Sequence, residues 1–319
     1  MGRGRGGAAP GFAAAVGPGG YRWWYVDGIA DDGRSAITVI AFVGSVFSPG
    51  YFRARRRRLD ADPMLHCGLN VVVHGEHGDA WAMSEYRGTA VERSDDGLVL
   101  GRSRWQSVDH GLDLALDERG SPWPRALRGR VRLRWPSAAA EAIALDRGQR
   151  HLWWPIAPMA AIEVELDAPR LRFRGSGYHD GNAGIEPLEQ ALRGWSWSRA
   201  RVDGGVALLY DVVDREGAAR PLGLFVDADG RRGPLHAPQL RALPHTRWRI
   251  ARGTRTDAGA DARLRRSLVD TPFYARALIE TSLRGRVATA VHEVVDLQRF
   301  CWSTQLLMLP RSIRGVGWW

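Results

Sequence analysis

Three short segments of this sequence combine aromatic rings with ionisable side chains, a combination that can support acid chemistry. They are Tyr21–Tyr25, His151–Trp154 and Tyr178–Asp180. Burial among aromatic rings favours the neutral form of a carboxylic acid and so keeps a proton available. From the residues alone, however, a structural role comes first, because aromatic side chains mostly build cores. Asp180 followed by Gly181 is also typical of a turn.

Motifs for other kinds of chemistry are absent. The sequence contains no P-loop, no dinucleotide fingerprint after a strand and no G-x-S-x-G nucleophile elbow, so we expect no cofactor. His74 and His77 flank Glu76 in a glycine-rich segment without a third ligand, which indicates a solvated hairpin turn and no metal site. Cys67 and Cys301 lie far apart, which argues against a disulfide framework and fits a reducing compartment.

The elements that must position these residues are predicted by hydrophobic periodicity. Apolar and polar residues alternate along most of the chain, which is typical of half-buried strands, and turn clusters separate the alternating runs. We therefore expect an all-β fold of antiparallel strands, as barrels or sandwiches, with little helix. The clearest strand candidates are Arg130–Trp135, Ile162–Leu166, Leu171–Arg174, Trp195–Trp197, Val206–Val213, Leu222–Val226 and Val287–Leu297.

The length of 319 residues exceeds that of a usual compact domain and indicates two domains, with one large barrel as the alternative. The clearest helix candidate is Glu186–Arg193, because Pro187 suits a first turn and Gly194 suits the position after the end. Glycine and proline interrupt the first twenty residues, so we expect no signal peptide. The expected division is a disordered tail at 1–19, an N-terminal β-domain at 20–190 and a C-terminal β-domain at 191–319.

The formal net charge of +10 comes from arginine, since the sequence contains no lysine. A basic surface favours anionic partners. No helix-turn-helix, RNP or zinc-finger pattern accompanies the arginines, so we expect no nucleic-acid binding. An anionic membrane surface is the better candidate. The basic run Arg53–Arg58 is then either a solvated loop or a lipid-facing patch, and Trp318 and Trp319 could assist docking.

Contact with a membrane is expected to be peripheral. No window approaches the roughly twenty apolar residues that a spanning helix requires. The longest apolar run, Ala36–Phe47, is interrupted by polar and glycine residues and is rich in β-branched side chains, which favours a buried strand.

Several longer segments carry a family resemblance when they are taken together. They are GGYRWWYVDGIADDGRSAITVIAFVGSVFSPGY, DPMLHCGLNVVVHG, WAMSEY, WWPIAP, GSGYHDGNAGIEPLE, GWSWSRARV and RSLVDTPFYARAL. In this order, across nearly the whole chain, they resemble the carotenoid 1,2-hydratases, also called hydroxyneurosporene synthases. This family is similar to a wider group of paired lipocalin-like β-barrels, in which a Trp-Trp-Tyr near the start and an Asp near the domain junction recur.

The resemblance implies cofactor-independent addition of water to the ψ-end group of acyclic carotenoids such as neurosporene and lycopene, on the cytoplasmic side of the inner membrane. The catalytic residues that it implies are His151, Trp153, Tyr178 and Asp180, which stand in matching segments. Ala183 departs from the family, where an aromatic residue is frequent, and this places the wall beside Asp180 in question.

The implied roles follow from the chemistry of a trisubstituted double bond. Protonation at C2 leaves a tertiary cation at C1, which water captures, so an acid is required and Asp180 is assigned to it. Trp153 and Trp24 suit stabilisation of the cation. His151 and Tyr178 are supporting residues, and Trp24 and Tyr25 are expected to bind substrate. A barrel with an apolar mouth would admit one end of the polyene while the rest stays in lipid.

Other interpretations stay open at this point. A carotenoid or lipid carrier would need the same aromatic lining but no acid, and a cyclase or pericyclase would add no water. Glu186, Asp27 and Asp270 are rival acids. The preferred carotenoid, the number of ends hydrated and the oligomeric state are not determined by the sequence.

Overall fold

The computed structural model describes residues 9–57, 60–76, 78–136, 140–308 and 313–314. The chain forms two compact units. The first contains the residues up to Pro187 and those from Gln305 onward, and the second spans Leu188–Thr304. Strands account for 58% of the structure and helices for 10%, so the expected all-β class is confirmed. The helices are α1 (Pro49–Arg57), η1 (Pro63–His66), η2 (Gly88–Ala90), α2 (Leu188–Ala191), η3 (Leu297–Arg299) and α3 (Trp302–Leu306).

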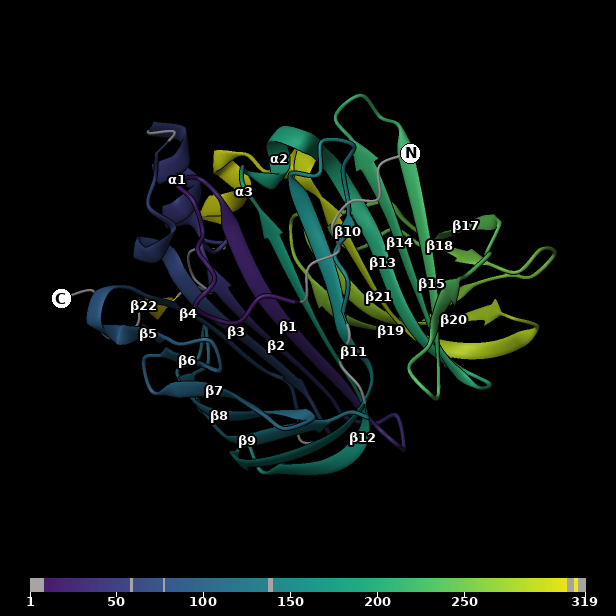
Figure 1. The fold of residues 1–319 in the computed structure, drawn as a ribbon, viewed down its shortest axis with the longest axis horizontal. Helices are drawn as coiled ribbons and strands as arrows, with labels where there is room; N and C mark the ends of the chain where they lie inside the picture. Colours follow the sequence, from purple (N-terminus) through teal and green to yellow (C-terminus); the bar gives the residue numbers. More distant parts are fainter. Residues whose placement is uncertain (1–8, 58–59, 77, 137–139, 309–312, 315–319) are drawn as a thin grey trace. The chain divides into compact units, whose positions relative to one another are not determined.

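The first unit is a single, nearly closed barrel sheet of 13 strands (Figure 1). Their order is β22-β4-β3-β2-β1-β12-β11-β9-β8-β7-β6-β5, with β10 paired to β11. The strands are β1 (Tyr21–Ala30), β2 (Ala36–Val43), β3 (Cys67–His74), β4 (Ala80–Tyr86), β5 (Val91–Arg93), β6 (Gly97–Leu100), β7 (Ser103–Val108), β8 (Gly111–Arg119), β9 (Ala126–Arg134), β10 (Ile143–Ala144), β11 (His151–Ala168), β12 (Leu171–Gly184) and β22 (Ile313–Arg314).

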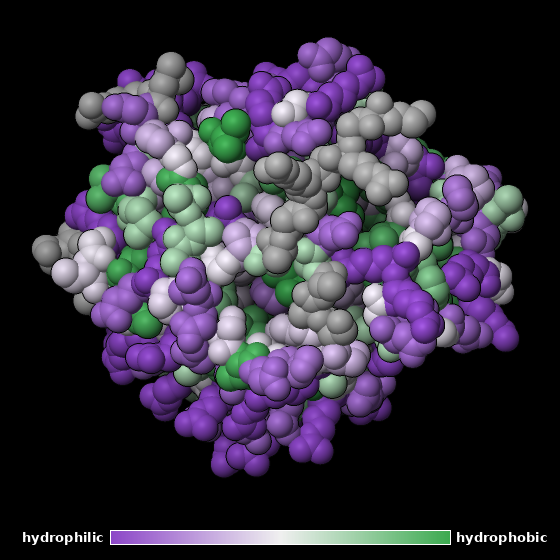
Figure 2. All heavy atoms as spheres, viewed as in Figure 1, coloured by the Kyte–Doolittle hydropathy of each residue, from purple (hydrophilic) through white to green (hydrophobic). Residues whose placement is uncertain are grey.

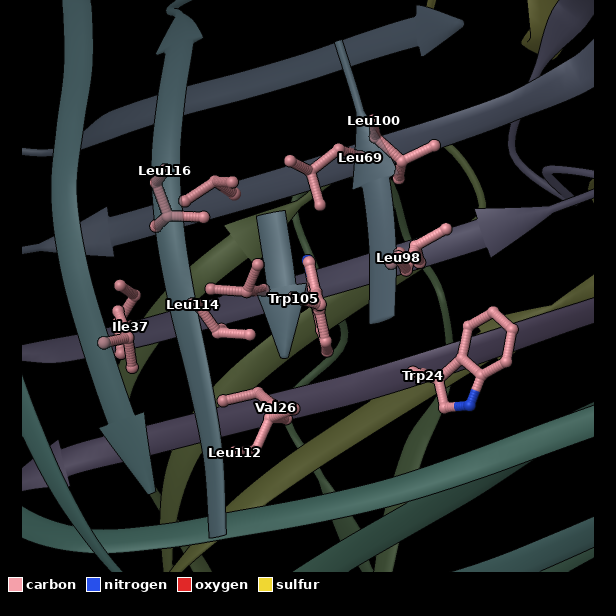
Figure 3. Packing of buried hydrophobic residues seen from close by; sticks show 14 of the residues in the cluster. Trp24, Val26, Ile37, Leu69, Leu98, Leu100, Trp105, Leu112, Leu114 and Leu116 are labelled. Carbon is pink, nitrogen blue, oxygen red and sulfur yellow. The ribbon is translucent and has the colours of Figure 1, made fainter. Parts of the chain in front are cut away.

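Alternate residues of these strands build one apolar core inside the barrel. Trp24 and Val26 of β1 point into it, and Leu112, Leu114 and Leu116 of β8 meet them (Figure 3). This is the two-residue period of a strand with one face buried in a core. The apolar side chains on this face of the sheet therefore fill the barrel.

A buried carboxylate links two strands that are not neighbours in the sheet. Glu118 of β8 accepts hydrogen bonds from Ser84 and Tyr86 of β4, the latter at 2.8 and 2.9 Å, and from Ser103 of β7 at 2.6 Å. Burial raises the pKa of Glu118, while the three hydroxyl donors oppose that rise. Because β4 and β8 are separated along the sheet order, these bonds tie the two ends of the sheet together.

The second unit contains a seven-stranded sheet and a two-stranded sheet. In the larger sheet the order is β16-β15-β14-β13-β21-β20-β19, and the smaller one pairs β17 with β18. The strands are β13 (Leu192–Val202), β14 (Gly205–Asp214), β15 (Ala219–Asp227), β16 (Arg232–Pro234), β17 (Gln239–Leu243), β18 (Arg252–Thr256), β19 (Arg263–Asp270), β20 (Tyr274–Leu283) and β21 (Arg286–Asp296).

Two local expectations differ from the structure. The predicted helix Glu186–Arg193 shrinks to the four residues of α2, because β13 begins at Leu192 and its backbone pairs with β14. The Arg53–Arg58 run lies mostly in α1 rather than in a loop, and Arg58 falls outside the described residues. In α1, Tyr51 and Phe52 are buried, which fixes the helix to the barrel.

The expected disordered tail at 1–19 is described from residue 9 onward. There Phe12 is buried, its ring lies 4.9 Å from that of Trp24, and its amide donates to the Asp95 carbonyl oxygen. These contacts hold the segment against the barrel of the first unit. The described part of the chain contains no helix long and apolar enough to cross a membrane. Hydrophilic side chains cover most of the face seen in Figure 2.

We predict that Glu118→Ala lowers the free energy of unfolding by about 2–4 kcal/mol, because three buried hydroxyl groups lose their acceptor. Urea denaturation measures the change. Asp117→Asn on the same strand is the control, since Asp117 pairs with the exposed Arg102 and its loss should cost within about 0.5 kcal/mol. Equal changes in the two variants would contradict the account of barrel closure.

Candidate active site

The pairing of β1 with β12 places the candidate residues on one face of the sheet. Tyr25 pairs with Asp180 and Asp27 pairs with Tyr178, and directly paired residues share a face. Tyr25 and Asp27 alternate with Val26, which points into the barrel core. The four side chains therefore lie on the face opposite to the core, and not inside the barrel as the expected apolar mouth would require.

Asp180 is held by two donors that act on the same oxygen. Trp153 Nε1 donates to Asp180 Oδ2 at 2.9 Å, and the Tyr178 hydroxyl donates to Oδ2 at 2.8 Å. Asp180 is 6% exposed, Trp153 1% and Tyr178 0%. Since β11 and β12 are neighbours in the sheet, the three residues form one rigid group around the carboxyl.

The hydroxyl of Tyr178 is kept protonated by its surroundings. Burial raises its pKa well above the ordinary value, and Asp180, in its ionised form, raises this pKa further. A phenol in this environment remains a hydrogen-bond donor at any ordinary pH. Tyr25 extends the group, because its ring lies 6.0 Å from that of Tyr178 and its hydroxyl donates to Asp27 Oδ2 at 3.2 Å.

His151 belongs to a neighbouring cluster. Its Nδ1 is hydrogen-bonded to the Tyr21 hydroxyl at 2.9 Å, and its Nε2 lies 3.4 Å from Glu186 Oε1. Burial lowers the pKa of His151, and the charges of Asp146 and Glu186 oppose this shift. A Cβ on Gly184 would lie 2.3 Å from Tyr21 Cε1 and 2.7 Å from His151 Nδ1, so only glycine leaves room for this pair.

One expected substrate-binding residue, Trp24, and the family departure Ala183 lie on the other face of the sheet. Trp24 is part of the barrel core, so its side chain does not face Asp180 (Figure 3). Ala183 pairs with Arg22 and is an odd number of residues from Asp180, so it cannot form the wall beside that carboxyl. The sequence showed the clusters but not which alternate residues face the core.

The three rival acids, Glu186, Asp270 and Asp27, lie in three different places. Glu186 contacts His151 and Arg150, while Asp270 lies in the second unit and accepts the Arg247 amide at 2.7 Å. Asp27 is the one that shares the Asp180 face. Sequence reasoning missed the partner role of Tyr21, although the alternation Tyr21, Trp23, Tyr25, Asp27 was a signal for it.

The described residues include no group of three or more His, Cys, Asp or Glu side chains able to hold a metal ion. The predicted hairpin turn after β3 is present, and there His74 Nδ1 lies 3.0 Å from Asp79 Oδ1. His77 lies outside the described residues.

Comparison with known proteins identifies the family. The model of the family described as "Carotenoid hydratase CrtC" matches residues 39–318. This chain belongs to the carotenoid hydratase family. The acyclic carotenoid 1,2-hydratase of Thiocapsa roseopersicina is 44% identical over 97% of this chain and 76% of its own length. The family expected from the sequence motifs is thereby confirmed.

Solved structures with the same fold confirm the lipocalin-like architecture. An AttH protein from Nitrosomonas europaea has a TM-score of 0.62 at 13% identity, covering 86% of this chain and 92% of its own. Kievitone hydratase from Nectria haematococca has a TM-score of 0.54 at 11% identity, covering 93% of this chain and 99% of its own. At these identities the likeness concerns the fold.

The alternation of β12 makes a prediction for His179. This residue lies between Tyr178 and Asp180 in sequence, but its side chain points toward the barrel core. Its Nδ1 donates to the Tyr25 carbonyl oxygen at 2.9 Å. Burial lowers its pKa from 6.5 to about 4. Below pH 6.5 the unfolded chain therefore takes up a proton that the folded chain does not, and stability falls as the pH drops toward 4.

His179→Asn removes this contribution. Between pH 7 and pH 5 the variant should lose about 2 kcal/mol less free energy of unfolding than the unmodified protein, as measured by urea denaturation at both values. His110→Asn is the matched control, because the His110 side chain is 62% exposed. A pH dependence unchanged by His179→Asn would contradict a core position for this ring.

Proposed function

We propose that this protein hydrates the C1=C2 bond of the ψ-end group of acyclic carotenoids, such as neurosporene and lycopene, to give 1-hydroxy-1,2-dihydro products. One observation carries the proposal: a buried carboxyl at Asp180 is oriented by an indole and a phenol that donate to the same oxygen. Two relatives named acyclic carotenoid 1,2-hydratase support acyclic carotenoids as the substrate class.

In the first step Asp180 delivers a proton to C2. Because Oδ2 already accepts hydrogen bonds from Trp153 and Tyr178, the acidic proton is placed on Oδ1. The π electrons of C1=C2 form the new C2–H bond, which leaves a tertiary cation at C1. A positioned acid of this kind typically contributes 10²–10⁴-fold to a rate.

The aromatic rings stabilise the cation until water attacks. Trp153 lies against the acid, and the rings of Tyr25 and Tyr178 lie beside it on the same face. Each desolvated ring can contribute about 0.5–2 kcal/mol to a cation without trapping it. The hydroxyl group comes from water and the proton from a carboxylic acid, so the proposed reaction needs no cofactor. His151 supports this face by positioning Tyr21.

Asp180→Asn should reduce hydration by at least about 100-fold while folding and carotenoid uptake persist, because the amide keeps the shape but donates no comparable proton. Mass spectrometry of the product from lycopene, which gains one water when hydrated, measures the loss. Asp113→Asn, an exposed change on β8, is the control and should retain activity.

Three outcomes separate the interpretations. Glu186→Gln should remain active, because Glu186 contacts His151 and Arg150 rather than Asp180. Retained hydration in Asp180→Asn together with its loss in Glu186→Gln would remove Asp180 as the acid. Absence of a water adduct from every form, including the unmodified protein, would favour a carrier or a cyclase.

We also propose that the protein docks on the cytoplasmic face of the inner membrane, where its substrate resides. Arg53, Arg56 and Arg57 of α1 are exposed, and we call them the α1 cationic patch. Each exposed arginine near an anionic leaflet contributes about 1 kcal/mol to the free energy of membrane binding. Arg58, Trp318 and Trp319, which were expected to assist, lie outside the described residues.

Replacing all three patch arginines by glutamine should abolish flotation with anionic liposomes at low salt, because their attraction to the headgroups is lost. The control replaces Arg104, Arg128 and Arg130, which are exposed on β7 and β9, and changes the net charge equally. Equal loss in both variants would show a general charge effect and contradict a defined patch.

A further inference from the structure

The Asp180 face contains a second segment of the same pattern. Tyr25-Val26-Asp27 on β1 repeats the Tyr-x-Asp arrangement of Tyr178-His179-Asp180 on β12. Because the strands are antiparallel, the tyrosine of each segment pairs with the aspartate of the other. The two segments are therefore related by an approximate twofold rotation about the centre of the pair.

The hydrogen bonds follow the same symmetry. The Tyr25 hydroxyl donates to Asp27 Oδ2 at 3.2 Å, as the Tyr178 hydroxyl donates to Asp180 Oδ2 at 2.8 Å. Asp27 is 0% exposed and Tyr25 5%. The mechanism above uses one carboxyl of this arrangement and leaves the other without a role.

We propose that Asp27 is a second catalytic residue, the general base that accepts a proton from the attacking water. This inference rests on the proposed hydration. Addition of water to an alkene needs one group that gives a proton and another that takes one. A pair of carboxyls on one face supplies both, with Asp180 as the acid and Asp27 as the base.

The register places the two carboxyl-bearing residues close together on one face of the sheet. Asp27 and Asp180 are diagonal neighbours across the β1–β12 pair, a relation that places residue positions about 7–8 Å apart. An acid and a base at these positions can therefore act on the same bound end group.

The step balances without another reactant. The Asp180 proton forms the C2–H bond with the electron pair of C1=C2, and a lone pair of water then forms the C1–O bond. The Asp27 carboxylate takes the proton that the bound water loses. Release of this proton to solvent and uptake of one by Asp180 restore the starting state.

The test compares two reactions of lycopene in D₂O, namely formation of the water adduct and entry of deuterium into recovered, unhydrated lycopene. Asp27→Asn should reduce hydration at least about 100-fold yet still exchange deuterium at C2, because Asp180 forms the cation and the cation returns to alkene without capture. Asp180→Asn should show neither reaction.

The outcomes are distinguishable from failure of the proposed function. If the unmodified protein forms no adduct, the hydration itself is refuted. If it hydrates and Asp27→Asn hydrates equally fast, or if Asp27→Asn loses adduct and exchange together while folded by circular dichroism, the base role is overturned. If Asp27→Asn does not fold, Asp27→Glu decides: slower hydration with retained exchange supports the base role, and parallel loss of both overturns it.

Discussion

The antiparallel pairing of β1 with β12 is the constraint on which the site depends. Its register sets Tyr25 opposite Asp180 and Asp27 opposite Tyr178, and the two-residue period of both strands turns all four side chains to one face. A shift of one residue in either strand would turn that strand's polar side chains into the core and its apolar ones out. Val26 and His179, which face the core, oppose such a shift.

Because of this pairing, the apolar core and the candidate catalytic residues of the first unit lie on opposite faces of one sheet. One face of the sheet closes around an apolar core, and Glu118 ties its ends together, so the barrel interior is used for stability. The other face holds buried polar groups, whose desolvation is costly unless they are hydrogen-bonded. The bonds from Trp153 and Tyr178 to Asp180 offset that cost and also orient the carboxyl. Stability and orientation therefore come from the same contacts.

Periodicity was sufficient to predict the class of fold, because runs such as Ile162–Leu166 and Leu171–Arg174 alternate in the way that half-buried strands must. It failed where long-range pairing overrides local preference. Asp180-Gly181 is typical of a turn, yet both residues lie within β12, since both pair with β1 and Gly181 also pairs with β11. Phe12 likewise follows a glycine-rich segment and is ordered by contact with Trp24.

The candidate site was predictable in part for the same reason. Family resemblance pointed to Trp153, Tyr178 and Asp180, and the structure brings these three together. Alternation alone implied that Trp24 and Tyr25 face opposite ways, but which of them faces the core depends on strands distant in the sequence. The crossed pair of Tyr-x-Asp segments was equally hidden, because it exists only once β1 and β12 are in register.

The most direct test of this account is a crystal structure of the Asp180→Asn variant with an acyclic carotenoid bound. The account predicts that the terminal C1 and C2 atoms lie within about 4 Å of the residue 180 side chain, on the face that carries Tyr25 and Trp153. An end group lying among Trp24, Val26 and Leu114 inside the barrel would contradict it.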